Sequence, residues 1–194
     1  MQVLKEEVRK DIFEASKKLF LEFGFQNTSM KAIAEKANVS KSNLYNYFKG
    51  KEDIFYSLTD NTAHNIEKAT VFFVGHKFSE SFGSEEFIVM MSQNLCNLIS
   101  NNRENLLLIM DHSKGTKYEN LKKNIIYSAE VDFAEALKNN GDAEDLLIAH
   151  IIVFNLIEGL LEIARNITEK DRMYRNIYRL IEYHVKGTKM LTNN

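Results

Sequence analysis

The chain has 194 residues, of which 44% are hydrophobic and 27% are charged, and its formal net charge is −2 at pH 7. These proportions are typical of a soluble globular protein and exclude a disordered tail. The chain has no proline and a single cysteine, Cys96, which excludes a proline-rich linker and an internal disulfide and fits a reducing compartment. Because long helices are not interrupted by proline, we predict an all-helical fold.

The charges are unevenly distributed along the chain. Residues 1–51 contain ten Lys or Arg against six Asp or Glu, a balance of +4, and the remainder contains 15 against 21, a balance of −6. A basic head on an acidic body is expected where only the head binds nucleic acid, because phosphate contacts supply most sequence-independent affinity.

The sequence also predicts where the protein resides. Its amino terminus is charged and periodic, unlike the continuous apolar stretch of a secretory signal. The longest apolar region, residues 146–161, is interrupted by His150, Asn155 and Glu158, which predicts that it falls short of a bilayer span. We therefore expect a soluble, cytoplasmic protein.

The first predicted helix runs from about residue 5 to residue 23, with apolar side chains at helical spacing. Gly24 is expected to end it as a left-handed cap, and Phe25 is expected to fold back on its last turn. This helix is the scaffold for the next two.

A short second helix is predicted over about residues 30–37. The hydroxyl of Thr28 or Ser29 can cap it by accepting an unpaired amide of its first turn. Its apolar side, with Ile33 and Ala34, is expected to face inward.

A tight turn and a third helix follow. Asn38 tolerates the left-handed backbone that such a turn requires, Val39 is expected to fill the core, and Ser40 can cap a helix over about 41–48. With Leu44 buried, the free side of that helix is polar and suits base edges and phosphates in a major groove. These free side chains are Lys41, Ser42, Asn43, Asn46 and Tyr47.

Seven short runs in this part of the chain agree in order and spacing with a known family. They are Phe23-Gly24-Phe25, Thr28-Ser29-Met30, Ile33-Ala34, Val39-Ser40, Leu44-Tyr45, Tyr47-Phe48 and Lys51-Glu52. Together they resemble the amino-terminal DNA-binding domain of the tetracycline-repressor (TetR) family, over roughly the first quarter of the chain. The family usually has Gly where this chain has Asn38, but Asn also tolerates the left-handed region, so an intact turn is expected.

The resemblance implies roles for individual residues. Base-edge contacts are expected from Lys41, Ser42, Asn43 and Asn46. Phosphate contacts are expected from Thr28, Ser29, Ser40, Tyr45, Tyr47 and Lys51. Lys51 also begins the next predicted helix, where the helix dipole disfavours a lysine unless a phosphate lies nearby.

Six further helices are predicted, which makes about nine in all. The fourth runs from Lys51 to about residue 74 and is followed by a segment of loop composition, residues 75–84. The others are expected over about 85–100, 103–112, 118–139, 143–167 and 169–191, with breaks at Asn101-Asn102, Gly115 and Asn139-Asn140-Gly141. We expect a DNA-binding domain over 1–50 and a regulatory and dimerisation domain over 51–194.

The last two predicted helices differ from the others, since the first of them is apolar on nearly every side. The resemblance implies that one face joins a second copy in a four-helix bundle. The alternative is that both helices are core of a monomer. The predicted dimer contacts are Ile152, Asn155, Gly159, Ile163, Met173, Ile177, Leu180 and Ile181.

A small-molecule site is predicted in the body. His150, Phe154 and Glu158 fall on one side of the penultimate helix, which places titratable groups in apolar surroundings. The two titratable groups either pair with each other or meet a ligand, and the sequence leaves both open. By analogy with the family, residues of the middle helices are expected to face this side of the penultimate helix, although such side chains also occur in an ordinary hydrophobic core. They are Met90, Asn94, Met110 and Tyr127.

No pattern in the sequence predicts catalysis. The five histidines show no ligand pairing at three or four residues, so no metal site is expected. The glycines never cluster as in a phosphate-binding loop, and no nucleophile elbow is present. We expect no enzyme and no cofactor.

The sequence thus predicts a homodimeric transcriptional repressor that binds a palindromic operator on double-stranded DNA and is released by a small-molecule effector. One alternative is an activator or architectural factor of the same fold without an inducer. Another is a helical ligand-binding or partner-binding protein without DNA binding, whose recognition helix would carry acidic or apolar replacements.

Overall fold

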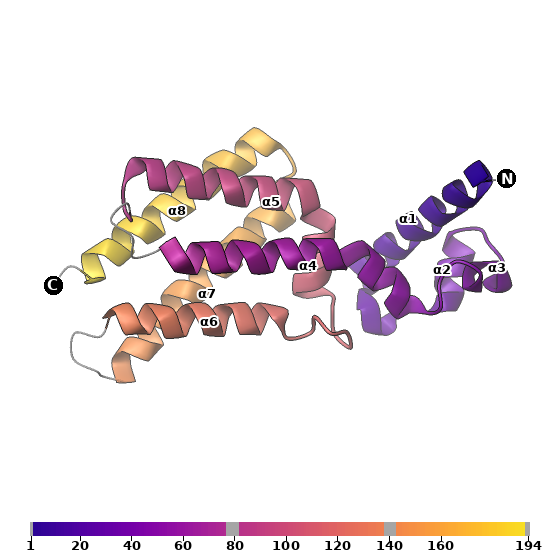
Figure 1. The fold of residues 1–194 in the computed structure, drawn as a ribbon, viewed down its shortest axis with the longest axis horizontal. Helices are drawn as coiled ribbons and strands as arrows, with labels where there is room; N and C mark the ends of the chain where they lie inside the picture. The colour runs from indigo at the N-terminus through magenta and orange to yellow at the C-terminus, as the bar shows by residue number, and fades with distance from the viewer. Residues whose placement is uncertain (1, 77–81, 138–142, 193–194) are drawn as a thin grey trace. The chain divides into compact units, whose positions relative to one another are not determined.

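The computed structural model describes residues 2–76, 82–137 and 143–192, and these residues form eight helices and no strand (Figure 1). The all-helical prediction is confirmed. The helices are α1 (Gln2–Asn27), α2 (Met30–Lys36), α3 (Lys41–Tyr45), α4 (Lys51–His76), α5 (Glu85–Asp111), α6 (Leu121–Leu137), α7 (Ala143–Asn166) and α8 (Lys170–Thr192).

Two predicted helix ends appear as interruptions inside longer helices. Gly24 has φ 77° and ψ 162° within α1, so the predicted break with positive φ is present, although the helix resumes to Asn27. Asn102, with φ −132° and ψ 18°, kinks α5, which joins the predicted helices 85–100 and 103–112 into one. The count of about nine is therefore corrected to eight for the described residues. The predicted end at Asn139-Asn140-Gly141 and part of the predicted loop 75–84 lie outside them.

Packing divides the chain into two compact units. The first contains Met1–His64 and Glu104–Leu121, and the second contains Asn65–Arg103 and Lys122–Asn194. Both α4 and α5 therefore contribute to each unit, and the kink at Asn102 lies next to a division. The predicted functional boundary at residue 50 stays a prediction.

An aromatic cluster forms the centre of the first unit. Phe20, Phe25 and Phe55 are buried, and their ring centroids lie 5.1 to 5.8 Å apart. Such pairs stabilise a core beyond the area they bury. Phe25 thus folds back on α1 as predicted. The second half of α5 belongs to this core, because Leu108 is fully buried there and the Phe25 amide donates to the His112 carbonyl at 2.9 Å.

A polar cluster holds the connection between α5 and α6 against α4 within the first unit. The Tyr118 hydroxyl donates to Asp60 Oδ1 at 2.6 Å, and Lys117 Nζ lies 3.0 Å from the same oxygen. The Lys117 amide donates to the Tyr56 hydroxyl at 3.1 Å. Burial, and then the hydrogen bond to Asp60, raise the pKa of Tyr118 to about 12.

In the second unit α7 and α8 pack closely together. A Cβ at Gly159 would lie 3.0 Å from Leu180 Cδ2, tighter than ordinary van der Waals contact, so glycine permits this approach. Arg103 closes the carboxyl end of α7, because its Nε donates to the Ala164 carbonyl at 2.6 Å and its second guanidinium nitrogen to that of Arg165 at 2.8 Å.

Helix α7 also contacts α6 but leaves apolar side chains uncovered. Ala149 and Val153 pack against Phe133 of α6 in a buried cluster. On the other side, Leu147 is 64% exposed and Phe154 is 42% exposed. An uncovered apolar strip on one helix is a feature of protein interfaces.

One segment of α7, Leu146–Asn166, is long and apolar enough by length and composition to cross a bilayer. The prediction that this region falls short of a bilayer span is therefore wrong as far as composition goes. Its few polar side chains do not lower the mean hydropathy below that of a membrane-spanning helix. Length and composition alone are weak grounds for a membrane helix, because the core helix of a soluble protein passes the same test.

Candidate nucleic-acid interface

The turn between α2 and α3 has the geometry that its residues predict. Ser29 caps α2, since its hydroxyl accepts the Ala32 amide at 3.1 Å. Asn38 has φ 55°, in the left-handed region, and the Val39 amide donates to the Ala34 carbonyl at 3.0 Å. The turn is therefore intact with Asn in the position where glycine was expected.

Helix α3 is short and anchored at two points. The Ser40 hydroxyl accepts the Asn43 amide at 3.1 Å and so caps the helix as predicted. Leu44 and Phe48 are buried in the core of the first unit. The helix ends at Tyr45, earlier than predicted, with Asn46 as its carboxyl cap.

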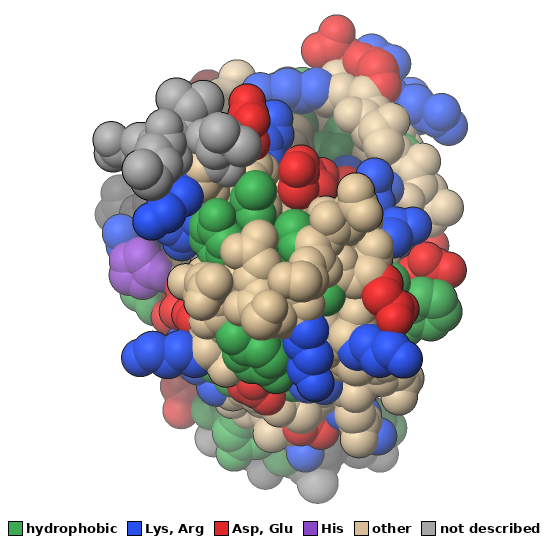
Figure 2. Space-filling view, turned by 90° about the vertical axis from the view of Figure 1, so that its right-hand side faces the viewer, with side chains coloured by type: hydrophobic (Ala, Val, Ile, Leu, Met, Phe, Trp, Pro, Cys, Tyr) green, Lys and Arg blue, Asp and Glu red, His purple; other side chains and the backbone are tan. Residues whose placement is uncertain are grey.

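This anchoring leaves the polar side of α3 at the surface. Lys41, Ser42, Tyr45 and Asn46 are exposed, and Asn43 and Tyr47 are partly exposed. Ser29 and Ser40, at the two helix starts, are exposed as well. Figure 1 shows α3 at the end of its unit, and Figure 2 faces that side, where Lys and Arg side chains lie beside hydrophobic side chains, some carboxylates and surface formed by other side chains and the backbone. Hydrogen-bonding groups and cations are thus available together.

Thr28 is placed differently from the other predicted contacts. Its side chain is buried, and its hydroxyl donates to the Gly24 carbonyl at 2.8 Å and lies 3.3 Å from the Leu19 carbonyl oxygen. The predicted phosphate contact of this hydroxyl is corrected, because the group is engaged in closing α1. Ser29 alone caps α2.

Lys51 also differs from its predicted role. Its ammonium group donates to the carbonyls of Phe25 at 2.9 Å, Thr28 at 3.1 Å and Gln26 at 3.2 Å. A lysine has three donor hydrogens, so these carbonyls use all of them. The predicted phosphate contact is corrected to an internal one, in which the cation fastens the start of α4 to the end of α1. The carbonyl end of α1 offsets the unfavourable position of a lysine at the start of α4.

The predicted small-molecule residues divide between the two units. Met110 belongs to the first unit and the other six to the second. Asn94 and Tyr127 are exposed, and Met90 is partly buried. The small-molecule site at these residues stays a prediction.

The titratable residues of that set pair with neighbours rather than with each other. His150 Nδ1 bonds to Glu130 of α6, and its ring stacks on Phe154. Glu158 lies 2.9 Å from Lys122 Nζ and 3.4 Å from a guanidinium nitrogen of Arg165. Both carboxylates thus tie α6 and α7 together, an arrangement that the sequence of α7 alone could not reveal.

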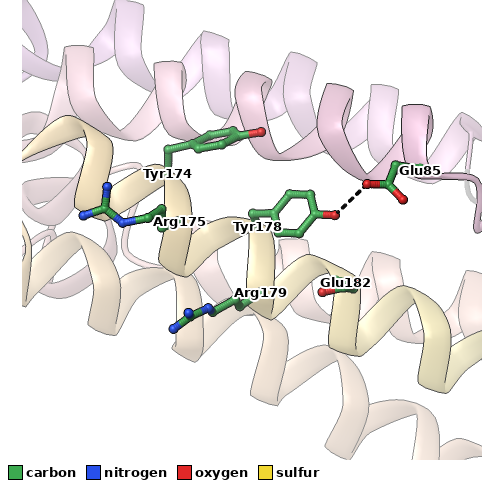
Figure 3. A pocket seen from close by; sticks show the side chains of 6 residues that line it. All are labelled: Glu85, Tyr174, Arg175, Tyr178, Arg179 and Glu182. Carbon is green, nitrogen blue, oxygen red and sulfur yellow. Dashed lines mark hydrogen bonds between the residues drawn. The ribbon is translucent and has the colours of Figure 1, made fainter.

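A surface hollow of about 410 Å³ lies elsewhere in the second unit, between the start of α5 and α8 (Figure 3). The Tyr178 hydroxyl donates to Glu85 Oε1 at 3.3 Å across it. In Figure 3 the guanidinium groups of Arg175 and Arg179 point away from the rings of Tyr174 and Tyr178. Sequence reasoning missed this hollow, because its side chains come from helices far apart in sequence. Its lining residues are Glu85, Tyr174, Arg175, Tyr178, Arg179 and Glu182.

The predicted dimer contacts divide into buried and accessible residues. Met173, Ile177 and Ile181 are fully buried within the chain, so their predicted role at a dimer interface is corrected to that of core. Gly159 and Leu180 contact each other, which accounts for the glycine without a second copy. Asn155 is exposed, and Ile152 and Ile163 are partly buried.

Among the residues that the structure describes, no group of three or more His, Cys, Asp or Glu side chains could hold a metal ion. The one cysteine, Cys96, is buried, and burial raises the pKa of its thiol. The exposed polar face of α3 therefore remains the best-formed candidate site in the first unit.

Comparisons with known proteins agree with this assignment. A sequence model described as bacterial regulatory proteins, tetR family, matches residues 12–58. YhgD, an uncharacterized HTH-type transcriptional regulator of Bacillus subtilis (strain 168), is 45% identical over 47 residues, which cover 24% of this chain and 25% of YhgD. HbdR, an HTH-type transcriptional regulator of Aromatoleum sp. (strain CIB), is 38% identical over 65 residues, 34% of this chain and 28% of HbdR. The matched residues span only about a quarter of these curated relatives.

A structural likeness extends over most of the chain. The crystal structure of NalD, the secondary repressor of the MexAB-OprM multidrug efflux pump in Pseudomonas aeruginosa, has a TM-score of 0.52 to this chain. The two are 18% identical, and the likeness covers 94% of this chain and 96% of NalD. At this identity the likeness shows the fold, and it includes the helical body that the sequence matches do not reach.

Proposed function

We propose that this chain, whose residues 12–58 match the tetR family of bacterial regulatory proteins, regulates transcription as a homodimer bound to a palindromic operator. The observation that carries the proposal is the capped turn between α2 and α3, which presents the polar side of α3 to solvent. A helix of this kind reads base edges in the major groove while its neighbours contact the backbone.

The structure supports a narrower set of DNA contacts than the sequence predicted. Lys41, Ser42, Asn43 and Asn46 are proposed to meet base edges. Phosphate contacts are proposed for Ser29, Ser40, Tyr45 and Tyr47, of which the first three are exposed and Tyr47 is partly exposed. Asn43→Ala should relax discrimination at one base pair by roughly 1–3 kcal/mol.

The proposed dimer interface is the exposed apolar strip of α7, formed by Leu147, Ile151 and Phe154. These positions follow one side of the helix at spacings of four and three residues, and each is at least 42% exposed in the single chain. Two half-sites one helical turn apart, about 34–36 Å, require two linked heads. Covering this strip with a second copy also accounts for so apolar a helix in a cytoplasmic protein.

We propose that the regulator is a repressor released by a small molecule. NalD, which shares the fold, is described as a repressor. Helices α4 and α5, the second with a kink at Asn102, run from one unit into the other, so an effector that changes the second unit can act on the first through them. Effector and DNA would then oppose each other reciprocally.

The experiment that tests the proposed function is selection of bound sequences from a random DNA pool, followed by fluorescence anisotropy on the best site. A palindromic site bound by two chains per duplex is the expected result. Salt-sensitive binding with no preferred sequence would favour an architectural factor instead. An effector that binds free and DNA-bound protein with equal affinity would defeat the proposed release mechanism.

A further inference from the structure

Arg9 of α1 is held in a fixed position by two aromatic rings. Its guanidinium carbon lies 5.4 Å from the centroid of Phe13 and 5.6 Å from that of Phe48. The two rings contact each other edge to face, with centroids 5.1 Å apart. A guanidinium group within about 6 Å of such rings is attracted to them, so both rings restrict the motion of this cation.

The residue that holds Arg9 also anchors the recognition helix. Phe48 is buried, and it follows Tyr47 just beyond the carboxyl end of α3. Arg9 is therefore fixed beside the end of α3, at an exposed position. Its cation adds to the surface that α3 presents, although it comes from a helix outside the turn motif.

The guanidinium group of Arg9 keeps its hydrogen-bonding groups free of the side chains and carbonyls that the structure describes. Among these, no hydrogen bond or ion pair joins it to an acceptor. This differs from Lys51, whose donors are all taken by carbonyls. A planar group with five donors and a fixed orientation matches the oxygens of a phosphate.

We propose that Arg9 binds a phosphate of the operator backbone and so positions α3 in the groove. This inference rests on the proposed DNA-binding function and extends the contact surface to α1. Because the partner is a phosphate, Arg9 strengthens binding to all DNA sequences to a similar extent.

The test compares the salt dependence of DNA binding in full-length variants. Arg9→Gln removes the charge and keeps a planar group that can still lie on Phe13 and Phe48, so the fold is preserved. Arg9→Lys keeps the charge. Lys10→Ala is the matched control, because it removes one charge from the next exposed position, about 100° around the helix.

For Arg9→Gln, the slope of log affinity against log salt should fall by about 0.9 for each head. Raising the salt concentration from about 50 to 200 mM weakens DNA binding of both proteins. The factor by which it weakens should be roughly 3.5-fold smaller per head for Arg9→Gln than for the wild type. Operator and unrelated DNA should be affected alike. Arg9→Lys should restore most of the slope, and Lys10→Ala should leave it unchanged.

The outcomes separate the inference from the function on which it rests. A slope that falls equally in Arg9→Gln and Lys10→Ala, or in neither, would overturn the role of Arg9 while DNA binding stands. A sequence preference that changes at one base pair in Arg9→Gln would also overturn it, because that result indicates a base contact. Wild-type protein that binds no DNA would remove the proposed function and the inference together.

Discussion

Helices α3 and α7 both expose a surface that the isolated chain does not cover, but the two surfaces are opposite in character. The exposed side of the five-residue α3 is polar, whereas α7 exposes large apolar side chains along its length. A polar face is hydrated when it is not bound, so it can bind and release DNA repeatedly. An apolar face is stable only while it is covered, as in a lasting dimer.

The largest expected effect concerns the apolar face. Ile151→Asp should prevent dimer formation, because leaving an unpaired charge in an apolar interface costs roughly 3–5 kcal/mol. Sedimentation velocity measures the result as a shift from dimer to monomer. Val71→Asp is the control, since Val71 is also exposed but lies on α4. Dimers that persist in Ile151→Asp would show that another surface joins the copies.

A change beneath the polar face should destabilise the first unit. Leu44 is fully buried, and Leu44→Ala should lower the free energy of unfolding by about 2–5 kcal/mol, since it leaves a cavity in the core. Urea unfolding followed by circular dichroism gives this value. Lys41→Ala, on the exposed side of the same helix, should change it by less than about 0.5 kcal/mol. Similar losses in both variants would contradict the orientation of α3.

A change at Lys51 tests whether its ammonium group binds carbonyls of the protein or a phosphate of DNA. Lys51→Met should lower the free energy of unfolding by about 1–3 kcal/mol, because three carbonyls lose their donor. It should leave the salt slope of DNA binding unchanged, in contrast to Arg9→Gln. A reduced slope with unchanged stability would restore the phosphate contact that the sequence predicted.

The turn before α3 should respond to backbone preference. Asn38→Ala should cost roughly 1–2 kcal/mol, because an ordinary residue at φ 55° is strained, whereas Asn38→Gly should be nearly neutral. Thermal unfolding of both variants measures the difference. Equal stability of the two would mean that the turn relaxes to another conformation.

The smallest expected effect is on the pH dependence of stability. The pKa of Tyr118 rises on folding from 10.0 to about 12, first because burial disfavours the phenolate and then because the phenol donates to Asp60. Its contribution to stability is therefore complete below pH 10 and is lost as pH rises through about 12. Urea unfolding across this range should decline less steeply in Tyr118→Phe. An identical decline would assign the loss to other groups.

Local signals predicted the turn region well. The caps Ser29 and Ser40 and the left-handed Asn38 act on neighbours within three or four residues, so the sequence contains both partners. The role of Lys51 was not predictable in this way. Lys51 bonds to carbonyls 23 to 26 positions earlier, and carbonyls have no side-chain signature.

The apolar helices show a different limit. The pattern of α7 and α8 predicted burial on more than one face, but it could not distinguish the face inside the chain from the face left uncovered. Met173 and Ile177 are core, while Leu147 and Phe154 are exposed. Hydrophobicity is non-directional, so only the packed structure separates the two.

The division of the first unit has a consequence for synthesis of the protein. Residues 1–64 leave the ribosome before the segment 104–121 that completes their packing. At a synthesis rate of about 5–20 residues per second, Leu108 and the His112 carbonyl that accepts the Phe25 amide are made several seconds after residues 1–64. We therefore expect the first unit to be incompletely packed in a nascent or truncated chain, and DNA binding to begin only after much of the chain has been made. Weaker amide protection in a 1–64 fragment than in the full chain would reveal this dependence.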